Sequence, residues 1–175
     1  MQASTGSDAI LCILNGKAGT VKALDAERRL CELFARHGAQ AKILVAQDGD
    51  DISALVRQET QHGCALIVAG GGDGTVNAVA SVLAGTDIVL GVLPLGTLNH
   101  FAKDLLLPLE LEGAVDNLFT GQTIQVDVGE VNGKLFLNNS SLGIYPVIVR
   151  QREKLQEHGR GKWSAFVQAV VYALL

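Results

Sequence analysis

Three glycines, an aspartate, a fourth glycine and a threonine follow one another in the stretch GGGDGT, residues 70–75. Glycine lets the backbone approach a bulky anion closely, and a helix that begins after such a loop offers unpaired N–H groups and a partial positive charge. A simple turn needs only one or two glycines. The stretch therefore predicts a phosphate-binding loop, although its spacing fits neither GxGxxG nor GxxxxGK[ST].

Asp73 is the unusual member of this loop, because phosphates repel a carboxylate unless a divalent cation or a transferred proton lies between them. Its presence indicates magnesium-dependent phosphoryl chemistry. We therefore predict Asp73 as the catalytic and metal-binding residue. The structural alternative is that Asp73 serves as a helix cap or as a first-turn charge.

Four short apolar runs have the length of strands buried on both faces, namely residues 9–14, 41–46, 64–70 and 87–94. Segments with helical spacing lie between them, and Gly38, Gly63 and Gly85 supply their stop signals. This alternation predicts an α/β fold in which a parallel sheet carries helices on both faces. Ligands of such sheets bind beyond the carboxyl ends of the strands, where GGGDGT lies.

Two further polar loops follow predicted strands and should reach the same edge of the sheet. They are NGKAG, residues 15–19, and PLGTLNHFAKDL, residues 94–105. Either loop alone is weak evidence, since an Asn-Gly pair after a strand is more often only a turn. Together with the glycine-rich loop they predict a composite nucleotide site, to which the two loops contribute Asn15, Gly16, Lys17, Gly96, Thr97 and Asn99.

Bulk properties fit a globular domain with a buried core, since 48% of the 175 residues are hydrophobic. The formal net charge of -4 argues against a nucleic-acid binder that uses a broad basic surface. Three scattered cysteines predict neither a disulfide framework nor a zinc site. Without a signal peptide or an apolar run of about 18 residues, we expect a cytoplasmic protein whose contact with membranes is peripheral at most.

The pattern changes near Gly121, where β-rich segments begin to flank Asn132-Gly133, a strong two-residue hairpin signal. We therefore divide the chain at residue 121. Residues 9–121 are expected to form the nucleotide-binding α/β domain, after a flexible N-terminus at 1–8. Residues 122–175 are expected to form an antiparallel hairpin and a helical segment. Residues 163–174 form an apolar helical stripe with too little sequence after it to cover it. We expect this stripe to dock on a partner or on a second copy of the chain.

The stretches GGGDGTVNAV, residues 70–79, and LGVLPLGTLNHFAKDLLLP, residues 90–108, resemble the diacylglycerol kinase catalytic domain family, which includes bacterial lipid kinases and sphingosine kinases. The resemblance extends from Ile10 to Ile144. It implies ATP as the phosphate donor, Mg²⁺, and a lipid hydroxyl at a membrane surface as the acceptor. The residues expected around the nucleotide phosphates are Gly71, Gly72, Asp73, Gly74 and Thr75, with Asn77 in the same motif.

The resemblance has three departures. Gly16 stands where the family usually has proline, Leu98 replaces a glycine, and His100 replaces an acid that would support the magnesium network. His100 is either a catalytic base or an ordinary loop histidine. Lys103 either reaches a phosphate or faces solvent, and Thr97 and Asn99 are expected to orient nucleotide or substrate.

The resemblance also implies that the hairpin begins a second, β-rich lobe, with the nucleotide in the cleft between the lobes. In bacterial members an aspartate late in that lobe is the proposed base. The chain stops before that position, so the lobe is expected to be incomplete here. Asp127, the nearest acid of the family pattern, fits a structural role at a strand end better than that of a base. We therefore expect nucleotide binding by this chain with impaired or absent turnover.

Three other functions remain open. An NAD kinase-like or phosphofructokinase-like enzyme would share the Gly-Gly-Asp-Gly core. A non-catalytic nucleotide-binding module would explain Leu98 and His100. A purely structural interaction domain would bind no nucleotide at all.

Overall fold

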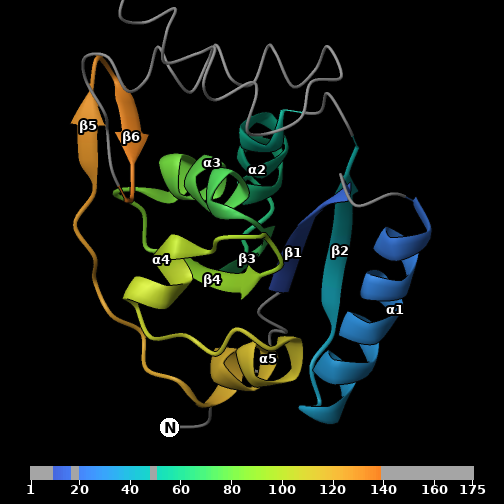
Figure 1. Cartoon of the computed structure of the whole chain (residues 1–175). Helices are drawn as coiled ribbons and strands as arrows, with labels where there is room; N and C mark the ends of the chain where they lie inside the picture. The colour runs from blue at the N-terminus through green and yellow to red at the C-terminus, as the bar shows by residue number, and fades with distance from the viewer. Residues whose placement is uncertain (1–9, 17–19, 48–50, 139–175) are drawn as a thin grey trace, which may run out of the picture. The chain divides into compact units, whose positions relative to one another are not determined.

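The computed structural model describes residues 10–16, 20–47 and 51–138 (Figure 1). Expectations about the N-terminus, Lys17, the segment 163–174 and a second lobe beyond residue 138 lie outside these residues. The described elements are β1 (Ile10–Asn15), α1 (Thr20–Arg36), β2 (Ala41–Ala46), α2 (Ile52–Thr60), β3 (Leu66–Gly71), α3 (Asp73–Leu83), β4 (Val89–Pro94), α4 (His100–Asp104), α5 (Leu111–Thr120), β5 (Gly129–Val131) and β6 (Lys134–Phe136).

The first four strands form one parallel sheet in the order β2-β1-β3-β4. The register pairs Asn15 with Ala46 and Gly71 with Pro94, so the strands end together at one edge. This confirms the predicted parallel α/β architecture and brings the loops that follow β1, β3 and β4 to a common edge.

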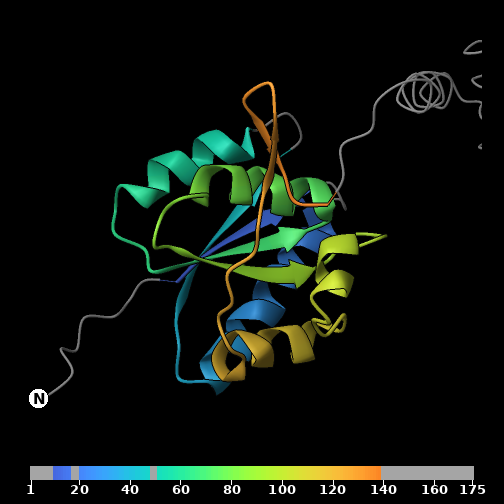
Figure 2. The same cartoon turned by 90° about the vertical axis from the view of Figure 1, so that its left-hand side faces the viewer.

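Helices cover both faces of the sheet (Figure 2), as the sequence predicts. Leu11 and Ile13 of β1 face a core built with α2 and α3, whereas Cys12 and Leu14 face a core built with α1 and α5. Because successive side chains of a strand point to opposite faces, a strand covered on both sides needs an unbroken apolar run. The sequence of β1 supplies that run.

Helix ends lie close to the predicted stop signals. The three glycines Gly38, Gly63 and Gly85 have φ angles of +70°, +79° and +76°, which suits glycine past a helix end. At the start of α2, the Asp51 side chain accepts a hydrogen bond from the backbone N–H of Ala54 at 3.1 Å. Local capping chemistry therefore sets these boundaries, as the sequence indicates.

Helix α5 has no counterpart among the sequence predictions. Ala114 and Val115 are buried in the core beside α1, and Leu111 and Leu118 pack against that core. These four residues have helical spacing, so the signal was present in the sequence. Figure 1 shows α5 and α1 on the same side of the sheet.

The predicted hairpin is confirmed as β5 and β6, which pair antiparallel. Asn132 and Gly133 have φ angles of 51° and 73°. Positive φ at both turn residues is the requirement of the type I′ turn that Asn-Gly favours. Residues 122–128 connect α5 to β5 without regular secondary structure.

No helix in residues 10–16, 20–47 and 51–138 is long and apolar enough to cross a membrane.

Candidate functional site

The loops that follow β3 and β4 pack backbone to backbone at the carboxyl edge of the sheet. The backbone N–H of Leu95 donates to the carbonyl of Gly71 at 3.1 Å, one residue beyond the β4 ladder. A Cβ atom on Gly96 would collide with the Cα atom of Gly72. Glycine at position 96 is therefore required for the two loops to approach this closely.

The first turn of α3 leaves backbone donors available. The N–H groups of Thr75 and Val76 donate to the carbonyl of Gly72 at 2.9 and 3.1 Å, and no side chain caps the helix. In the described part of the chain, the N–H groups of Asp73 and Gly74 have no hydrogen-bond partner. A Cβ on Gly74 would meet nothing within 4 Å. Two free donors at the positive end of a helix, next to open space, fit an anion such as phosphate.

Thr75 and Asn15 make contacts that hold this loop in place. Thr75 is 3% exposed, and its Oγ1 accepts a hydrogen bond from Asn15 Nδ2 at 3.0 Å. A Cβ on Gly71 would collide with the Thr75 side chain. The end of β1 and the start of α3 are thereby joined, so Asn15, Gly71 and Thr75 hold the shape of the loop.

The Asp73 carboxylate joins three segments. Its Oδ1 accepts hydrogen bonds from the Phe101 backbone N–H at 3.1 Å and from Asn138 Nδ2 at 3.4 Å. Partial burial tends to raise the pKa of this carboxyl, but hydrogen bonds from the N–H groups of Phe101 and His100, the Asn138 amide and the charge of His100 together lower it. Asp73 is therefore ionised at neutral pH, and it caps α4 instead of its own helix.

The Asn99 side chain stabilises its own loop. Its Oδ1 accepts from the Gly96 N–H at 3.0 Å, and its Nδ2 donates to the carbonyls of Pro94 and Gly96 at 3.0 and 2.9 Å. Asn99 itself has left-handed backbone with φ of 51°, which asparagine tolerates better than most residues. Its described contacts thus fix the shape of the loop, and a role in orienting a ligand stays a prediction.

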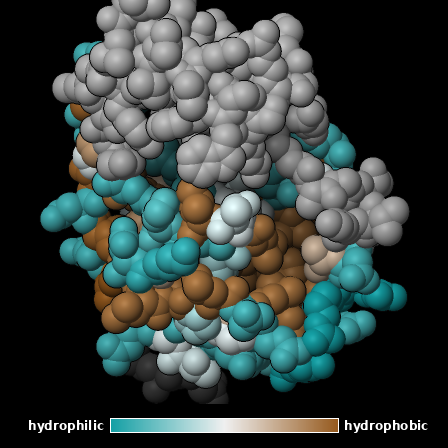
Figure 3. All heavy atoms as spheres, viewed as in Figure 1, coloured by the Kyte–Doolittle hydropathy of each residue, from teal (hydrophilic) through white to brown (hydrophobic). Residues whose placement is uncertain are grey.

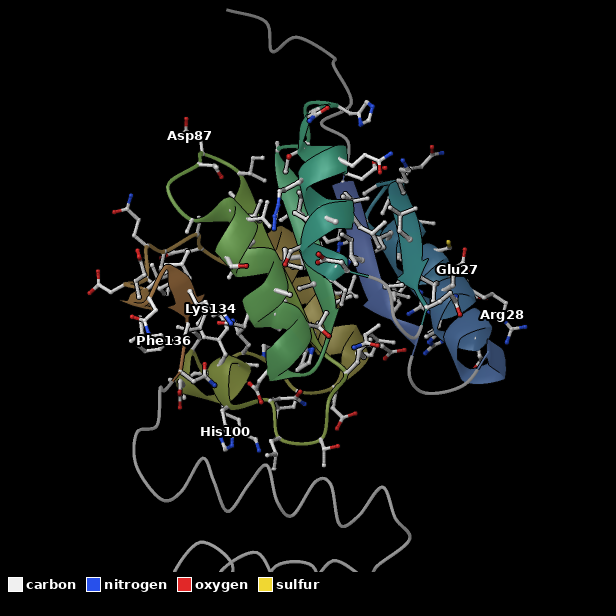
Figure 4. The ribbon with its side chains drawn as sticks, turned by 90° about the horizontal axis from the view of Figure 1, so that it is seen from above. Glu27, Arg28, Asp87, His100, Lys134 and Phe136 are labelled. Carbon is white, nitrogen blue, oxygen red and sulfur yellow. The ribbon has the colours of Figure 1, made fainter. Side chains whose placement is uncertain are left out.

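Other predicted site residues differ in their surroundings. Thr97, His100 and Lys103 are exposed, and the His100 ring projects away from the ribbon in Figure 4. Gly16 directly follows β1, and a Cβ there would come within 2.9 Å of the Ala46 carbonyl oxygen. Lys17 lies outside the described residues.

The described ranges contain no group of three or more His, Cys, Asp or Glu that could hold a metal ion by itself.

Asn77 is on α3 but not in the glycine-rich loop. Its side-chain amide hydrogen-bonds the backbone of Leu135 and Leu137 at 3.1 Å each. Sequence reasoning missed this contact and missed Asn138 as a neighbour of Asp73. No pattern of spacing in the sequence predicts contacts between residues that are 58 to 65 positions apart, as these pairs are.

Large apolar side chains are exposed next to the site. Leu95 is 43% exposed and Leu98 is 57% exposed in the loop before α4, and Leu106 is 90% exposed after it. Figure 3 shows hydrophobic residues at the surface beside α4 and its linker to α5. A cavity of about 560 Å³ lies between β4 and residues 122–126, and Phe101 is one of its lining residues. Apolar surface and polar loops therefore adjoin one another at α4.

Comparisons with known proteins agree with this geometry. The family model of the diacylglycerol kinase catalytic domain matches residues 9–131. A protein of Escherichia fergusonii named "Probable lipid kinase YegS" is 36% identical over 139 residues, which are 77% of this chain and 46% of that protein. A "Probable lipid kinase YegS-like" protein of Pseudomonas aeruginosa is 40% identical over 142 residues, 78% of this chain and 44% of that protein.

A solved structure supports the same relationship. A diacylglycerol kinase from Bacillus anthracis superposes with a TM-score of 0.61 at 28% sequence identity, over 77% of this chain and 47% of that chain. This chain therefore spans about half of the length of the curated relatives it matches.

Proposed function

Because the chain belongs to the diacylglycerol kinase catalytic domain family, whose curated relatives are named lipid kinases, we propose that it binds ATP for transfer of the γ-phosphoryl group to a lipid hydroxyl. The observation that carries the proposal is the first turn of α3. It combines two backbone donors that have no partner in the described part of the chain, open space at Gly74 and the ionised carboxylate of Asp73. This arrangement supports binding of a nucleotide polyphosphate together with a cation.

The donor set at Asp73 fits Mg²⁺ held jointly with a nucleotide. Mg²⁺ is usually bound through one or two carboxylates together with substrate phosphates and water, so a dedicated protein cage is not needed. Asp73 supplies one ionised carboxylate, which would hold the cation. When bound, Mg²⁺ would neutralise phosphate charge.

In the proposed reaction the lipid hydroxyl oxygen forms a bond to the γ-phosphorus while the bond from that phosphorus to the β–γ bridging oxygen breaks. ADP leaves, and the hydroxyl proton passes to a base or to solvent. Phosphoryl transfer depends mainly on positioning and charge stabilisation. Gly71, Gly72 and Gly74 would position the phosphates through their backbone, while the Thr97 hydroxyl and Asn99 would orient nucleotide or acceptor.

The exposed leucines support an apolar acceptor. Leu98 stands where the family has glycine, and together with Leu95 and Leu106 it places hydrocarbon surface beside the polar loops. A lipid must bring its hydroxyl to the phosphate site while its chains stay in apolar surroundings. We therefore propose that the protein works in the cytoplasm at a membrane surface, with no nucleic-acid partner. We also propose that the chain contacts a second copy of itself through residues 163–174.

The test is calorimetric titration of the chain with ATP and ADP, with and without Mg²⁺, beside the variants Asp73→Ala and Asp87→Ala. Asp87 is an exposed carboxylate before β4, and Figure 4 shows it on the other side of the ribbon from His100. We expect magnesium-dependent binding that Asp73→Ala weakens at least about tenfold and Asp87→Ala leaves unchanged. A folded wild-type chain that binds neither nucleotide would contradict the proposal.

Transfer is tested separately with radiolabelled ATP and vesicles that contain diacylglycerol, with NAD as the competing acceptor. Label in the lipid supports the kinase. Label in NAD would favour the NAD kinase-like alternative. Magnesium-nucleotide binding without transfer to either acceptor, even in a protein of the relatives' full length, would favour a binding module.

A further inference from the structure

The side-chain amide of Asn77 occupies the place of a neighbouring strand beside β6. Its Nδ2 donates to the carbonyl of Leu135 at 3.1 Å, and its Oδ1 accepts from the backbone N–H of Leu137 at 3.1 Å. A residue of a parallel strand makes the same pair of bonds, one to the carbonyl before the opposite residue and one to the N–H after it. Asn77 thus caps the free edge of the hairpin with one amide.

The register of the hairpin explains why these two backbone groups are available. Val131 pairs with Lys134 and Gly129 with Phe136, with a two-residue turn between the strands. In such a hairpin the pairs next to the turn exchange hydrogen bonds, so the polar groups of Leu135 point away from β5. The N–H of Leu137 lies two residues further along and points the same way. Without Asn77, this carbonyl and this N–H would have no protein partner among the described residues.

Few polar contacts hold residues 122–138 to the rest of the domain. Among the residues that the structure describes, three hydrogen bonds join this segment to the rest of the domain. Two of them are made by the Asn77 side chain and one by the Asp73 side chain. Leu137 adds apolar packing against the core that contains α3. Apolar packing tolerates sliding, whereas a paired donor and acceptor fix the register of a strand.

The contact continues to the glycine-rich loop. Asn138 is the residue after Leu137, and its Nδ2 reaches Asp73 Oδ1 at 3.4 Å. α3 carries both Asp73 and Asn77, so one helix holds the hairpin at Asn77 and receives the Asn138 side chain at Asp73. Figure 4 shows the hairpin residues Lys134 and Phe136 beside α3 and α4. A shift of β6 along α3 would therefore move Asn138 relative to the carboxylate.

We propose that Asn77 is a positioning residue: it sets the register of the β5–β6 hairpin on α3 and thereby aims Asn138 at Asp73. Its amide acts through the hairpin and does not serve as a nucleotide ligand, in contrast to the role that the sequence motif suggested. The effect on nucleotide binding rests on the proposed function, whereas the effect on the hairpin does not.

The first experiment measures backbone amide exchange by NMR in wild type, Asn77→Ala and Ser81→Ala. Ser81 lies on the same helix, and its Oγ donates to the Ala78 carbonyl at 2.8 Å within that helix, so it controls for loss of a polar side chain. In Asn77→Ala we expect the Leu137 amide and residues 129–136 to exchange at least about tenfold faster, with β1 and β3 unchanged. Unchanged exchange at Leu137 would overturn the proposal.

The second experiment is a double-mutant cycle on the affinity for magnesium-ADP with Asn77→Ala, Asn138→Ala and the double variant. If Asn77 acts through Asn138, each single change weakens binding about three- to tenfold and the double variant binds no more weakly than Asn77→Ala. Additive effects would overturn the positioning role. If the wild type binds no nucleotide, the proposed function fails, and the exchange experiment alone decides whether Asn77 sets the hairpin register.

Discussion

The loops after β3 and β4 lie against each other at one edge of the sheet, yet their polar groups are used differently. In the β3–α3 loop the N–H groups of Asp73 and Gly74 have no partner among the described residues. In the β4–α4 loop the Asn99 side chain hydrogen-bonds three backbone atoms of Pro94 and Gly96. The loop that leaves these donors free for a ligand thus lies against a loop whose shape is held by hydrogen bonds of its own Asn99 side chain.

The two loops are also coupled. Gly96 packs on Gly72, and Asp73 accepts a hydrogen bond from the first turn of α4. We therefore expect changes in the supporting loop to cost fold stability and changes in the open loop to cost ligand binding, with Asp73 contributing to both because it accepts a hydrogen bond from α4. Substitutions at four positions test this division.

The largest effect on stability is expected for Gly96→Ala. The new Cβ would collide with the Gly72 backbone, which cannot rotate away as a side chain can. Overpacking of this kind costs about 1–3 kcal/mol, and we expect the upper end. Urea denaturation measures the loss, and a variant as stable as wild type would show that the loops separate easily.

Asn99→Ala should follow, with a loss of about 2 kcal/mol from three side-chain hydrogen bonds and from left-handed backbone that alanine adopts poorly. Asn99→Gly separates the two causes, because glycine accepts the backbone angle but makes no side-chain bond. The glycine variant should recover part of the loss. Equal stability of the two variants would assign the whole effect to the hydrogen bonds.

Asp73→Asn should cost about 1 kcal/mol at neutral pH, because a neutral amide oxygen can still accept from Phe101 but the bond loses its charge assistance. The pKa of Asp73 is lowered in the folded protein. Its contribution is therefore complete above the ordinary aspartate pKa of about 3.9 and is lost as the pH falls through the lower, folded-state value. Denaturation from pH 7 to pH 3 should show the two proteins converging. A constant difference would mean that ionisation does not matter.

Gly74→Ala should change stability least, by under about 0.5 kcal/mol, because a Cβ there meets nothing within 4 Å. The methyl group would instead occupy space beside the free N–H groups. We therefore expect weaker magnesium-ATP binding in calorimetry with an unchanged denaturation midpoint. Full affinity in this variant would place the phosphates away from Gly74.

Local patterns explain what the sequence predicted correctly. Apolar runs predicted the four strands, the stop glycines predicted the helix ends, and Asn132-Gly133 predicted the hairpin turn. Each of these features is determined by residues that are neighbours in the chain. The structural alternative for Asp73 is confirmed in part: Asp73 is an acidic residue in the first turn of α3, whereas its capping hydrogen bond goes to another helix, α4. Helix α5 was missed although its residues have helical spacing.

The sequence alone determined the parallel sheet, the position of the glycine-rich loop at its carboxyl edge and the family, because strand periodicity and glycine spacing are properties of short segments. Only the tertiary structure decided the partners of the polar side chains. Asp73 meets Phe101 across 28 positions and Asn138 across 65, and Asn77 meets Leu135 across 58. Such contacts depend on how α3, α4 and β6 pack together, and no local pattern in the chain encodes that packing.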